Sequence, residues 1–289
     1  MESIKLGFIG GGNIVQAFIN GLHRSNQLKL TNTMISCPNA NEKPIFKQYS
    51  EYIQTTTSNI DLCRFADIVL FAVKSKFIKS ICNELNEHLN HDDKKRILFV
   101  SVIPGLKILT IEKWLMIKNE NIVRIMYNVA VATENGCFCF AMSKLNESMK
   151  QSYENLKFLF NAVGQYAGNV TEDQLDVVTA LMGSGPAFFC LVCEAMADGA
   201  VKMGLPRDLA LAMTKQTMVG CANLLLSSKD KHPAQLRDEI ATPGGTTIYG
   251  LHALETKAVR GAFIDAISVA AQRAQNMSKE LETFENDNS

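Results

Sequence analysis

The sequence of 289 residues has no excess of charge of either sign. Lys and Arg together number 29, as do Asp and Glu, so the formal net charge at pH 7 is zero. Proteins that bind nucleic acid or an anionic membrane surface usually carry clustered positive charge. The balanced charge therefore gives no reason to expect either of them as a partner.

The chain also lacks the features of secreted and membrane-spanning proteins. Its N-terminus has no basic stretch followed by a long apolar core, which a secretory signal requires. We find no run of 18 or more residues that is free of charge and apolar enough to cross a bilayer. Eight cysteines are too few for a disulfide scaffold, and most lie in apolar runs, as reduced and packed thiols do. These absences predict a cytoplasmic protein without a membrane partner.

Patterns that bind metal ions are missing as well. The five histidines show no ligand spacing. Cys190 and Cys193 form a CxxC pair inside an apolar helical stretch, with no second pair and no nearby histidine. We predict no metal site and assign these two cysteines to core packing.

What the sequence does contain is enough apolar material for a large core, at 47% of all residues. In the first half, short apolar runs alternate with helical patterns, which predicts a parallel sheet with helical crossovers. The expected strands are Ile4–Ile9, Thr33–Ser36, Ile68–Val73, Ile97–Val102, Ile122–Met126, Cys137–Ala141 and Gln165–Val170. The expected helices between them are Asn13–His23, Pro44–Tyr49, Asn59–Phe65, Phe77–His88 and Met149–Ala162.

From about Thr171 onward the pattern is helical only. The expected helices there are Glu172–Leu181, Pro186–Met203, Arg207–Leu226, Pro233–Ile240, Thr246–Leu254 and 257–281. The sequence thus predicts an α/β Rossmann-type domain with a mostly parallel sheet over residues 1–170, and an all-helical dimerisation domain over residues 171–289. A helical array of this size often buries its apolar face against a second copy, so we expect a homodimer.

A glycine-rich segment follows the first predicted strand and opens the first helix. Such a turn lets the backbone approach a pyrophosphate, which the helix N-terminus attracts. A glycine-rich turn without a ligand is the alternative, and the fingerprint's third small residue is replaced by Val15. The predicted context of strand, turn and helix favours dinucleotide binding. The residues assigned to it are Gly10, Gly11, Gly12, Asn13 and Ile14.

The end of the second strand bears on the choice of cofactor. NAD sites usually have an acidic residue here to hold the ribose 2′-hydroxyl. This chain has Ser36 and Asn39 instead, which could donate hydrogen bonds to a 2′-phosphate. They could also be ordinary turn residues. The missing acid favours NADPH, with NADH as the second choice.

A second glycine-rich segment, Thr242–Thr247, precedes a helix in the C-terminal half. Its exposed N–H groups can bind a carboxylate, with threonine hydroxyls on both sides. Taken alone, a plain turn between helices is the better explanation. For Gly183–Pro186, tight packing of helices through small residues explains the pattern at least as well as a ligand does.

Together these segments resemble the pyrroline-5-carboxylate reductase family. The resemblance covers nearly the whole chain and is densest between residues 176 and 255. It rests on Asp176–Phe189, Lys202–Pro206, Leu236–Glu239, Pro243–Thr247, Gly7–Asn13 and Ala72–Lys74.

The resemblance implies NAD(P)H-dependent reduction of 1-pyrroline-5-carboxylate to L-proline by a dimer that is often built into a decamer. Thr247 would hydrogen-bond the ring nitrogen of the substrate. Ser36 and Asn59 would meet the 2′-phosphate of NADPH. The residues implied to hold the substrate carboxylate or to lie beside it are Thr242, Gly244, Gly245, Thr246 and Asn128. Those implied to line the cofactor cleft are Ala72, Val73 and Lys74.

Two alternatives stay open at this point. The segment Asn128–Ala130 replaces the Asn-Thr-Pro that is usual in the family, and Tyr127 before it replaces a small residue. These departures are compatible with another imine as substrate or with a dinucleotide-binding relative without activity. A hydroxyacid dehydrogenase is disfavoured, because Phe188–Glu194 lacks the lysine which that class uses.

Overall fold

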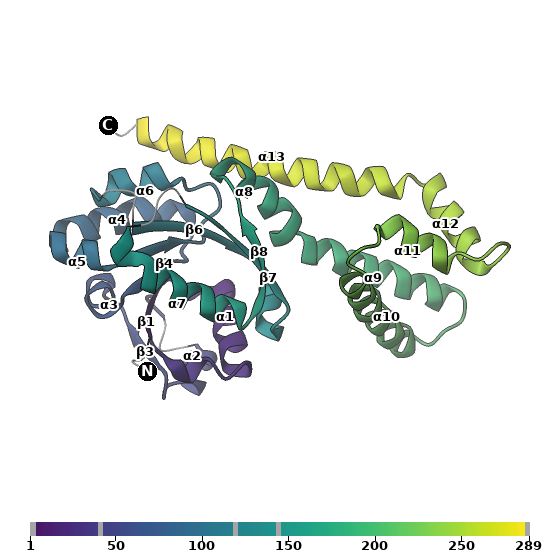
Figure 1. Ribbon diagram of the computed structural model, residues 1–289, viewed down its shortest axis with the longest axis horizontal. Helices are drawn as coiled ribbons and strands as arrows, with labels where there is room; N and C mark the ends of the chain where they lie inside the picture. The colour runs from purple at the N-terminus through teal and green to yellow at the C-terminus, as the bar shows by residue number, and fades with distance from the viewer. Residues whose placement is uncertain (1–3, 40–42, 118–120, 143–145, 287–289) are drawn as a thin grey trace. The chain divides into compact units, whose positions relative to one another are not determined.

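The computed structural model describes residues 4–39, 43–117, 121–142 and 146–286. The chain forms two compact units, one comprising Met1–Gly183 with Ala270–Ser289 and the other Ser184–Val269. Figure 1 shows the ribbon with the label of each element. We describe each unit by itself.

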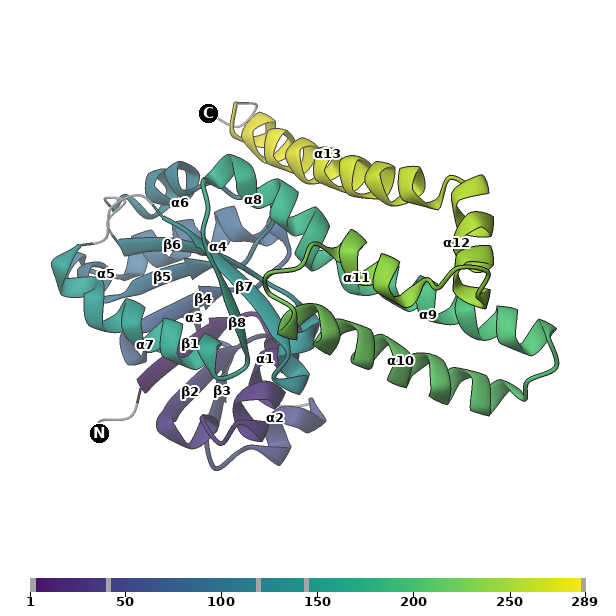
Figure 2. The ribbon, with the colours of Figure 1, turned by 45° about the vertical axis from the view of Figure 1, so that its right-hand side comes forward.

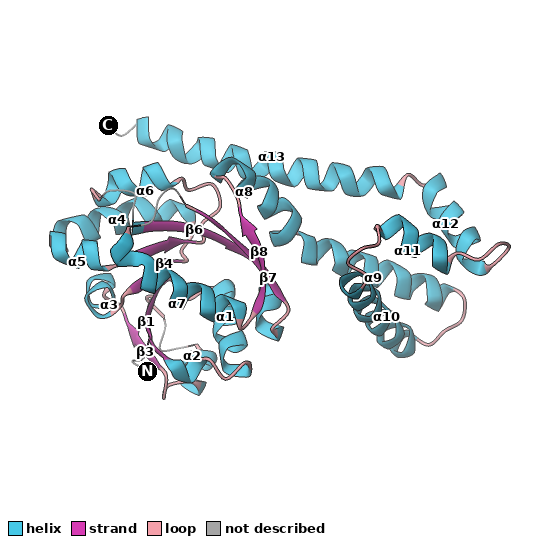
Figure 3. Cartoon of the chain, viewed as in Figure 1, coloured by secondary structure: helices cyan, strands magenta, loops and turns pink. Residues whose placement is uncertain are grey.

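The first unit is built on an eight-stranded sheet with the order β3-β2-β1-β4-β5-β6-β7-β8. The strands β1 to β6 run parallel, whereas β7 pairs with β6 in the antiparallel direction and with β8 in parallel (Figure 3). A Rossmann-type domain with a mostly parallel sheet is thereby confirmed. The strands are β1 (Ile4–Ile9), β2 (Thr31–Ser36), β3 (Ile53–Thr56), β4 (Ile68–Phe71), β5 (Leu98–Ser101), β6 (Ile122–Tyr127), β7 (Gly136–Ala141) and β8 (Gly164–Asn169).

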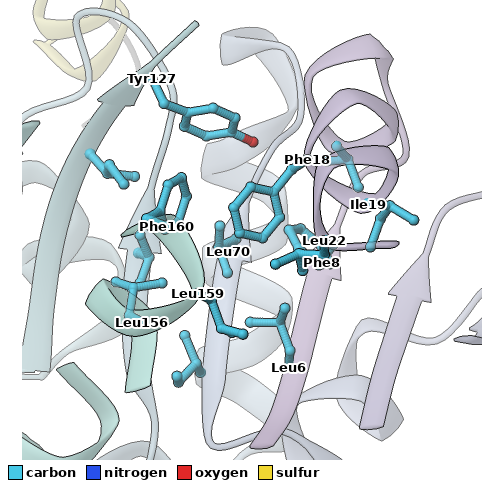
Figure 4. Close-up of a cluster of buried hydrophobic side chains, with 14 of the residues drawn as sticks. Leu6, Phe8, Phe18, Ile19, Leu22, Leu70, Tyr127, Leu156, Leu159 and Phe160 are labelled. Atoms are coloured by element: carbon cyan, nitrogen blue, oxygen red, sulfur yellow. The ribbon is translucent and has the colours of Figure 1, made fainter. Parts of the chain in front are cut away.

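Helices cover both faces of this sheet, because alternate side chains of its buried strands are apolar on each face. One core cluster joins the sheet to α1, α2 and α7, and a second joins it to α3, α4 and α6. The aromatic centre of the first cluster consists of Phe18, Tyr127 and Phe160 (Figure 4), with ring centroids of Phe18 and Phe160 4.3 Å apart. The helices are α1 (Asn13–Arg24), α2 (Pro44–Gln48), α3 (Asn59–Phe65), α4 (Ser75–His88), α5 (His91–Arg96), α6 (Ile108–Leu115), α7 (Lys150–Asn161) and α8 (Glu172–Val178).

The first helix of the predicted helical region belongs to the sheet unit. Leu175 on α8 is buried in a cluster with Cys139 and Ala141 of β7. The last part of α13 also belongs to this unit, where Gly105 approaches the backbone of Ser278. The compact units therefore divide after Gly183 rather than at Val170, where the pattern changes from strands to helices.

The second unit is helical throughout and keeps many large apolar side chains exposed (Figure 2 shows its helices). Two stretches, Glu172–Lys202 and Arg207–Ser227, are long and apolar enough to cross a membrane by length and mean hydropathy alone. Cys190, which we expected in the core, is exposed on this unit, so that expectation is wrong. The helices are α9 (Gly185–Lys202), α10 (Arg207–Ser227), α11 (Pro233–Ile240), α12 (Thr246–Thr256) and α13 (Val259–Asn286), the last of which extends into the first unit.

Candidate functional site

One set of candidate residues lies where the strand order of the sheet reverses. Successive strands run outward from β1 through β2 to β3, whereas β4 pairs with the other edge of β1. In open α/β sheets, ligands bind at this switch point, beyond the carboxyl ends of the strands. The N–H of Gly10 donates to Ser36 O (2.8 Å), and the N–H of Ala72 donates to Ile9 O (2.9 Å). The glycine-rich segment is thus held between the ends of β2 and β4.

An added side chain would have a different consequence at each of the three glycines of this segment. Gly10 has a φ of 105°, and a Cβ there would lie 2.5 Å from Ala72 O. A Cβ on Gly11 would lie 2.9 Å from the sulfur of Cys37. A Cβ on Gly12 would meet no protein atom within 4 Å. Gly12 is therefore the position where the absence of a side chain leaves space for a ligand.

Gly12 is the N-cap of α1 and supplies no side-chain cap. The N–H groups of the first helical turn, which includes Asn13 and Ile14, have no partner within the helix. Together with the helix dipole, they form a site suited to a phosphate group. A pyrophosphate fits these residues as they stand.

Tyr127 and Val15, which depart from the usual pattern, belong to the core beneath this turn. Val15 is fully buried. The Tyr127 hydroxyl donates to Ile14 O (3.2 Å), and burial raises the pKa of the Tyr127 phenol. Tyr127 therefore anchors the start of α1 from within the core.

Ser36 and Asn59, both expected near the 2′-phosphate, are in direct contact. Ser36 ends β2 and is buried, and Asn59 begins α3. The Ser36 hydroxyl donates to Asn59 Oδ1 (2.7 Å). The Asn59 amide nitrogen in turn donates to Glu84 Oε2 (2.9 Å). Ser36 and Asn59 were expected from the sequence, whereas Glu84 is identified only by the structure.

Ala72, Val73 and Lys74 connect the end of β4 to α4. Ala72 and Val73 are half-buried beside Gly10, where an added Cβ would meet both of them. Lys74 is exposed and is the N-cap residue of α4. The three residues therefore lie at the same carboxyl edge as the glycine-rich turn.

Lys43 is a cation that no sequence motif places in the site. Its side chain hydrogen-bonds Gly11 O and lies over the ring of Phe46, with Nζ 5.8 Å from the ring centroid. This contact cannot be predicted from a local sequence pattern, because Lys43 and Gly11 are 32 residues apart. The structure thus brings a positive charge to the glycine-rich turn.

A second set of candidate residues, in the second unit, is the turn before α12. Gly245 N–H donates to Thr242 O (3.0 Å), and Gly244 between them has a φ of 69°. This is the pattern of a type II turn, with proline at the second position and glycine at the third. A Cβ on Gly245 would lie 2.5 Å from the Thr242 hydroxyl, which fixes the choice of glycine.

The turn leads directly into the first helical residues of α12. Gly245 is the N-cap and offers no side-chain cap, so the N–H groups of Thr246 and Thr247 start the helix without one. Thr247 is half-buried and Thr246 is exposed. A helix N-terminus with adjacent hydroxyls can hold a carboxylate and orient a polar group beside it.

Asn128 and Gly183 lie in the first unit rather than in the second. Asn128 follows β6, and its side-chain oxygen accepts the N–H of Cys137 (3.3 Å), which fixes the direction of its amide. A Cβ on Gly183 would lie 2.3 Å from Met126 Cε, so this glycine permits tight packing. The site residues thus form two sets, one at the carboxyl edge of the sheet and one at the N-terminus of α12.

Within the part of the chain that the structure describes, no three His, Cys, Asp or Glu side chains gather as a metal ion would require. The donors present are backbone N–H groups, hydroxyls, amides and the ammonium groups of Lys43 and Lys74. Such a set is suited to phosphates and carboxylates.

Two family models match the chain. Residues 172–277 match the model described as pyrroline-5-carboxylate reductase dimerisation. Residues 5–105 match the model described as NADP oxidoreductase, coenzyme F420-dependent. The first match covers α8 to the middle of α13, and the second covers the strands around the glycine-rich turn.

Individual relatives are similar over almost the full length. A pyrroline-5-carboxylate reductase of Pisum sativum is 34% identical over 277 residues, which cover 96% of this chain and 97% of the relative. Pyrroline-5-carboxylate reductase 3 of Bos taurus is 35% identical, with coverage of 95% and 86%. The solved Plasmodium falciparum pyrroline carboxylate reductase with NADP bound has a TM-score of 0.82 at 30% identity, covering 96% of this chain and 99% of its own. The Coxiella burnetii pyrroline-5-carboxylate reductase has a TM-score of 0.80 at 32% identity, with coverage of 97% and 99%.

Proposed function

Because this chain belongs to the pyrroline-5-carboxylate reductase family, we propose that it reduces 1-pyrroline-5-carboxylate to L-proline with NADPH. This is the last step of proline biosynthesis. The observation that carries the proposal is the near full-length similarity to these enzymes. The two glycine-rich turns, each opening a helix, supply the binding chemistry that the reaction needs.

The cofactor site that we propose is the carboxyl edge of the sheet. When bound, NADPH supplies the hydride that reduces the C=N carbon of the substrate. Gly12 leaves space for the pyrophosphate, which the N–H groups of Asn13 and Ile14 then hold. Ser36 and Asn59 meet the 2′-phosphate, with Gly10 and Gly11 shaping the turn. NADH is the alternative cofactor, since a 2′-hydroxyl can occupy the same place. The cleft wall is formed by Ala72, Val73 and Lys74.

The substrate site that we propose is the turn before α12. The N–H groups of Gly244 and Thr246, with the Thr242 hydroxyl, bind the carboxylate. Gly245, whose own N–H donates to Thr242 O, shapes the turn that presents them. The Thr247 hydroxyl hydrogen-bonds the ring nitrogen and orients the imine. Asn128 is a further residue that we assign to the substrate. A threonine hydroxyl is too weak an acid to be the main proton source, so its role is orientation.

We propose that the working form is a homodimer, with a decamer as the larger assembly. Support comes from the match to the dimerisation model and from the many exposed apolar side chains of the second unit. An apolar face of this kind is typical of a surface that another copy covers. An apolar face covered by a second copy also explains the high mean hydropathy of Glu172–Lys202 and Arg207–Ser227, and no membrane is needed to explain it. All eight cysteines are free, which supports a reducing compartment such as the cytoplasm.

The proposal is tested by following the oxidation of the reduced cofactor by absorbance, with purified protein and 1-pyrroline-5-carboxylate. We expect turnover with both cofactors and a higher kcat/KM with NADPH than with NADH. Folded protein that binds NADPH but does not turn over this substrate would contradict the proposal. Assays with other cyclic imines would then separate a different substrate from an inactive relative.

A further inference from the structure

Glu84 is a charged residue beside the proposed 2′-phosphate site. The proposed function assigns no role to it. It lies on α4 and is half-buried. Its carboxylate accepts the Asn59 amide N–H (2.9 Å), while Asn59 Oδ1 accepts the Ser36 hydroxyl proton (2.7 Å). The three side chains form one chain of hydrogen bonds that ends on a carboxylate.

The direction of this chain follows from the chemistry of its members. A carboxylate can only accept hydrogen bonds, so it fixes the NH₂ end of the Asn59 amide toward Glu84. The oxygen end then faces Ser36 and takes the one proton that the hydroxyl can donate. What the pair retains for a ligand is the lone pairs of Ser36 Oγ and the second N–H of Asn59.

This set of donors and acceptors suits the two cofactors unequally. A ribose 2′-hydroxyl can donate to Ser36 Oγ and accept from Asn59, so it satisfies both groups. A 2′-phosphate is acceptor-only and would have to take the Ser36 proton away from Asn59. The negative charge of the 2′-phosphate is also repelled by the carboxylate of Glu84, which accepts the hydrogen bond from Asn59.

We propose that Glu84 is a positioning residue which, through Asn59, limits the preference of this protein for NADPH over NADH. The inference rests on the proposed function, which places Ser36 and Asn59 at the 2′-group. Glu84 lowers affinity for the 2′-phosphate, whereas Lys43 at Gly11 brings a charge of the opposite sign to the same edge. The cofactor ratio is set by the balance of these two charges.

The test is Glu84→Gln, which keeps the shape of the side chain and removes its charge. A glutamine can donate to Asn59 Oδ1, so the amide can turn over and leave the Ser36 proton for a phosphate. We expect the Kd of NADP⁺, measured by titration calorimetry, to fall about three- to tenfold, the size of one nearby charge at a protein surface. The Kd of NAD⁺ should change less than about twofold.

The matched control is Glu87→Gln, which makes the same charge change at an exposed position of the same helix. It should leave the ratio of the two Kd values unchanged. If Glu84→Gln lowers thermal stability, Glu84→Ala provides a second variant that frees the Asn59 amide and shifts the ratio in the same direction. A ratio that stays constant, or moves toward NAD⁺, in these variants overturns the role of Glu84.

Ser36→Ala separates this inference from the proposed function beneath it. If the site assignment is right, this variant binds both cofactors more weakly, because the 2′-hydroxyl of NAD⁺ loses its acceptor and the 2′-phosphate of NADP⁺ loses a donor. If Ser36→Ala changes neither Kd, the 2′-group lies elsewhere and the assigned cofactor site fails. If Ser36→Ala weakens binding but Glu84→Gln leaves the ratio of the two Kd values unchanged, only the role of Glu84 is wrong.

Discussion

The Thr247 hydroxyl is the side-chain group to which we assign direct contact with the reacting imine. We expect Thr247→Val, which keeps the shape but removes the hydroxyl, to lower kcat/KM about 10- to 100-fold, the value of one hydrogen bond to a charged group. Thr247→Ser should retain most of the activity, because it keeps the hydroxyl. Steady-state kinetics on both variants, with circular dichroism to check the fold, measures this. Equal activity of the valine and serine variants would show that the hydroxyl is not used.

Lys43 gives a second prediction for a single residue. Its ammonium group is held at Gly11 O, beside the expected phosphates of the cofactor. Lys43→Ala should raise the Kd of NADPH about three- to tenfold at low salt, with a smaller effect at high salt as screening grows. Lys47→Ala, an exposed lysine on α2, is the control for net charge. Equal effects of the two substitutions would place Lys43 outside the phosphate site.

The residues of the site differ in how far the sequence alone identifies them. Gly10 to Ile14 and Thr242 to Thr247 are contiguous, so one local motif contains both the turn and the helix start. Ser36 came from its place at the end of the second strand, whereas Asn59, 23 residues away, came from the family resemblance. Lys43 and Glu84 became visible only when the fold brought them to Gly11 and Asn59, because no local pattern links such distant positions.

At the scale of the elements, the strand–turn–helix unit of β1 and α1 predicts different effects of substituting Gly10 and Gly12. Gly10→Ala should lower the free energy of unfolding by about 1–3 kcal/mol, because it combines a positive φ with a backbone clash. Gly12→Ala meets open space and should change stability by less than about 0.5 kcal/mol, while weakening NADPH binding. Urea unfolding and cofactor titration of both variants distinguish the two roles. A stable Gly10→Ala variant would contradict the first prediction.

A buried ion pair ties α8 to the sheet and to α6. Arg124 on β6 is 3% exposed and contacts Glu172 (2.8 Å), which also accepts the N–H of Ile108 (3.0 Å) at the start of α6. Glu172→Ala would leave the guanidinium buried without its carboxylate. We expect a loss of about 2–4 kcal/mol in unfolding free energy, below the value for a fully buried pair because Glu172 is partly exposed.

The matched variant is Arg124→Met, which removes the buried charge and leaves the more exposed partner behind. It should cost less than Glu172→Ala in the same urea titration. The opposite order would show that packing of the arginine stem, rather than charge burial, determines the stability of this contact.

Short length or missing apolar periodicity explains two of the elements that the sequence analysis missed. It does not explain α6, whose buried Ile108, Ile111 and Leu115 follow a helical period. The strand β3 has four residues, and the helix α5 has the sequence HDDKKR with no apolar periodicity. Its folding depends on an Asn90 cap and on contacts of Lys94 and Arg96 with distant backbone carbonyls. The 12-residue helix α1, which has a continuous apolar face, was predicted to within one residue, because its pattern reports burial directly.

At the scale of the whole molecule, the change from strands to helices was visible, but the compact units were not. The sequence places the change at Val170, where the last strand ends. It does not show that α8 packs on β7, or that the end of α13 lies in the same unit as the sheet. These are tertiary contacts between segments far apart in the chain, and a local pattern carries no information about them.

Self-association is the remaining prediction at this scale. Leu191 on α9 is 64% exposed, in a unit with many other exposed apolar side chains. If a second copy covers this face, Leu191→Glu buries a charge in the interface and should shift the sedimentation of the protein toward the monomer. Leu109→Glu, at a leucine of the first unit that is 69% exposed, should leave the sedimentation unchanged. If both variants sediment like the parent protein, the dimer forms through a face that excludes Leu191. A mass of two or ten chains for the parent distinguishes the dimer from the decamer.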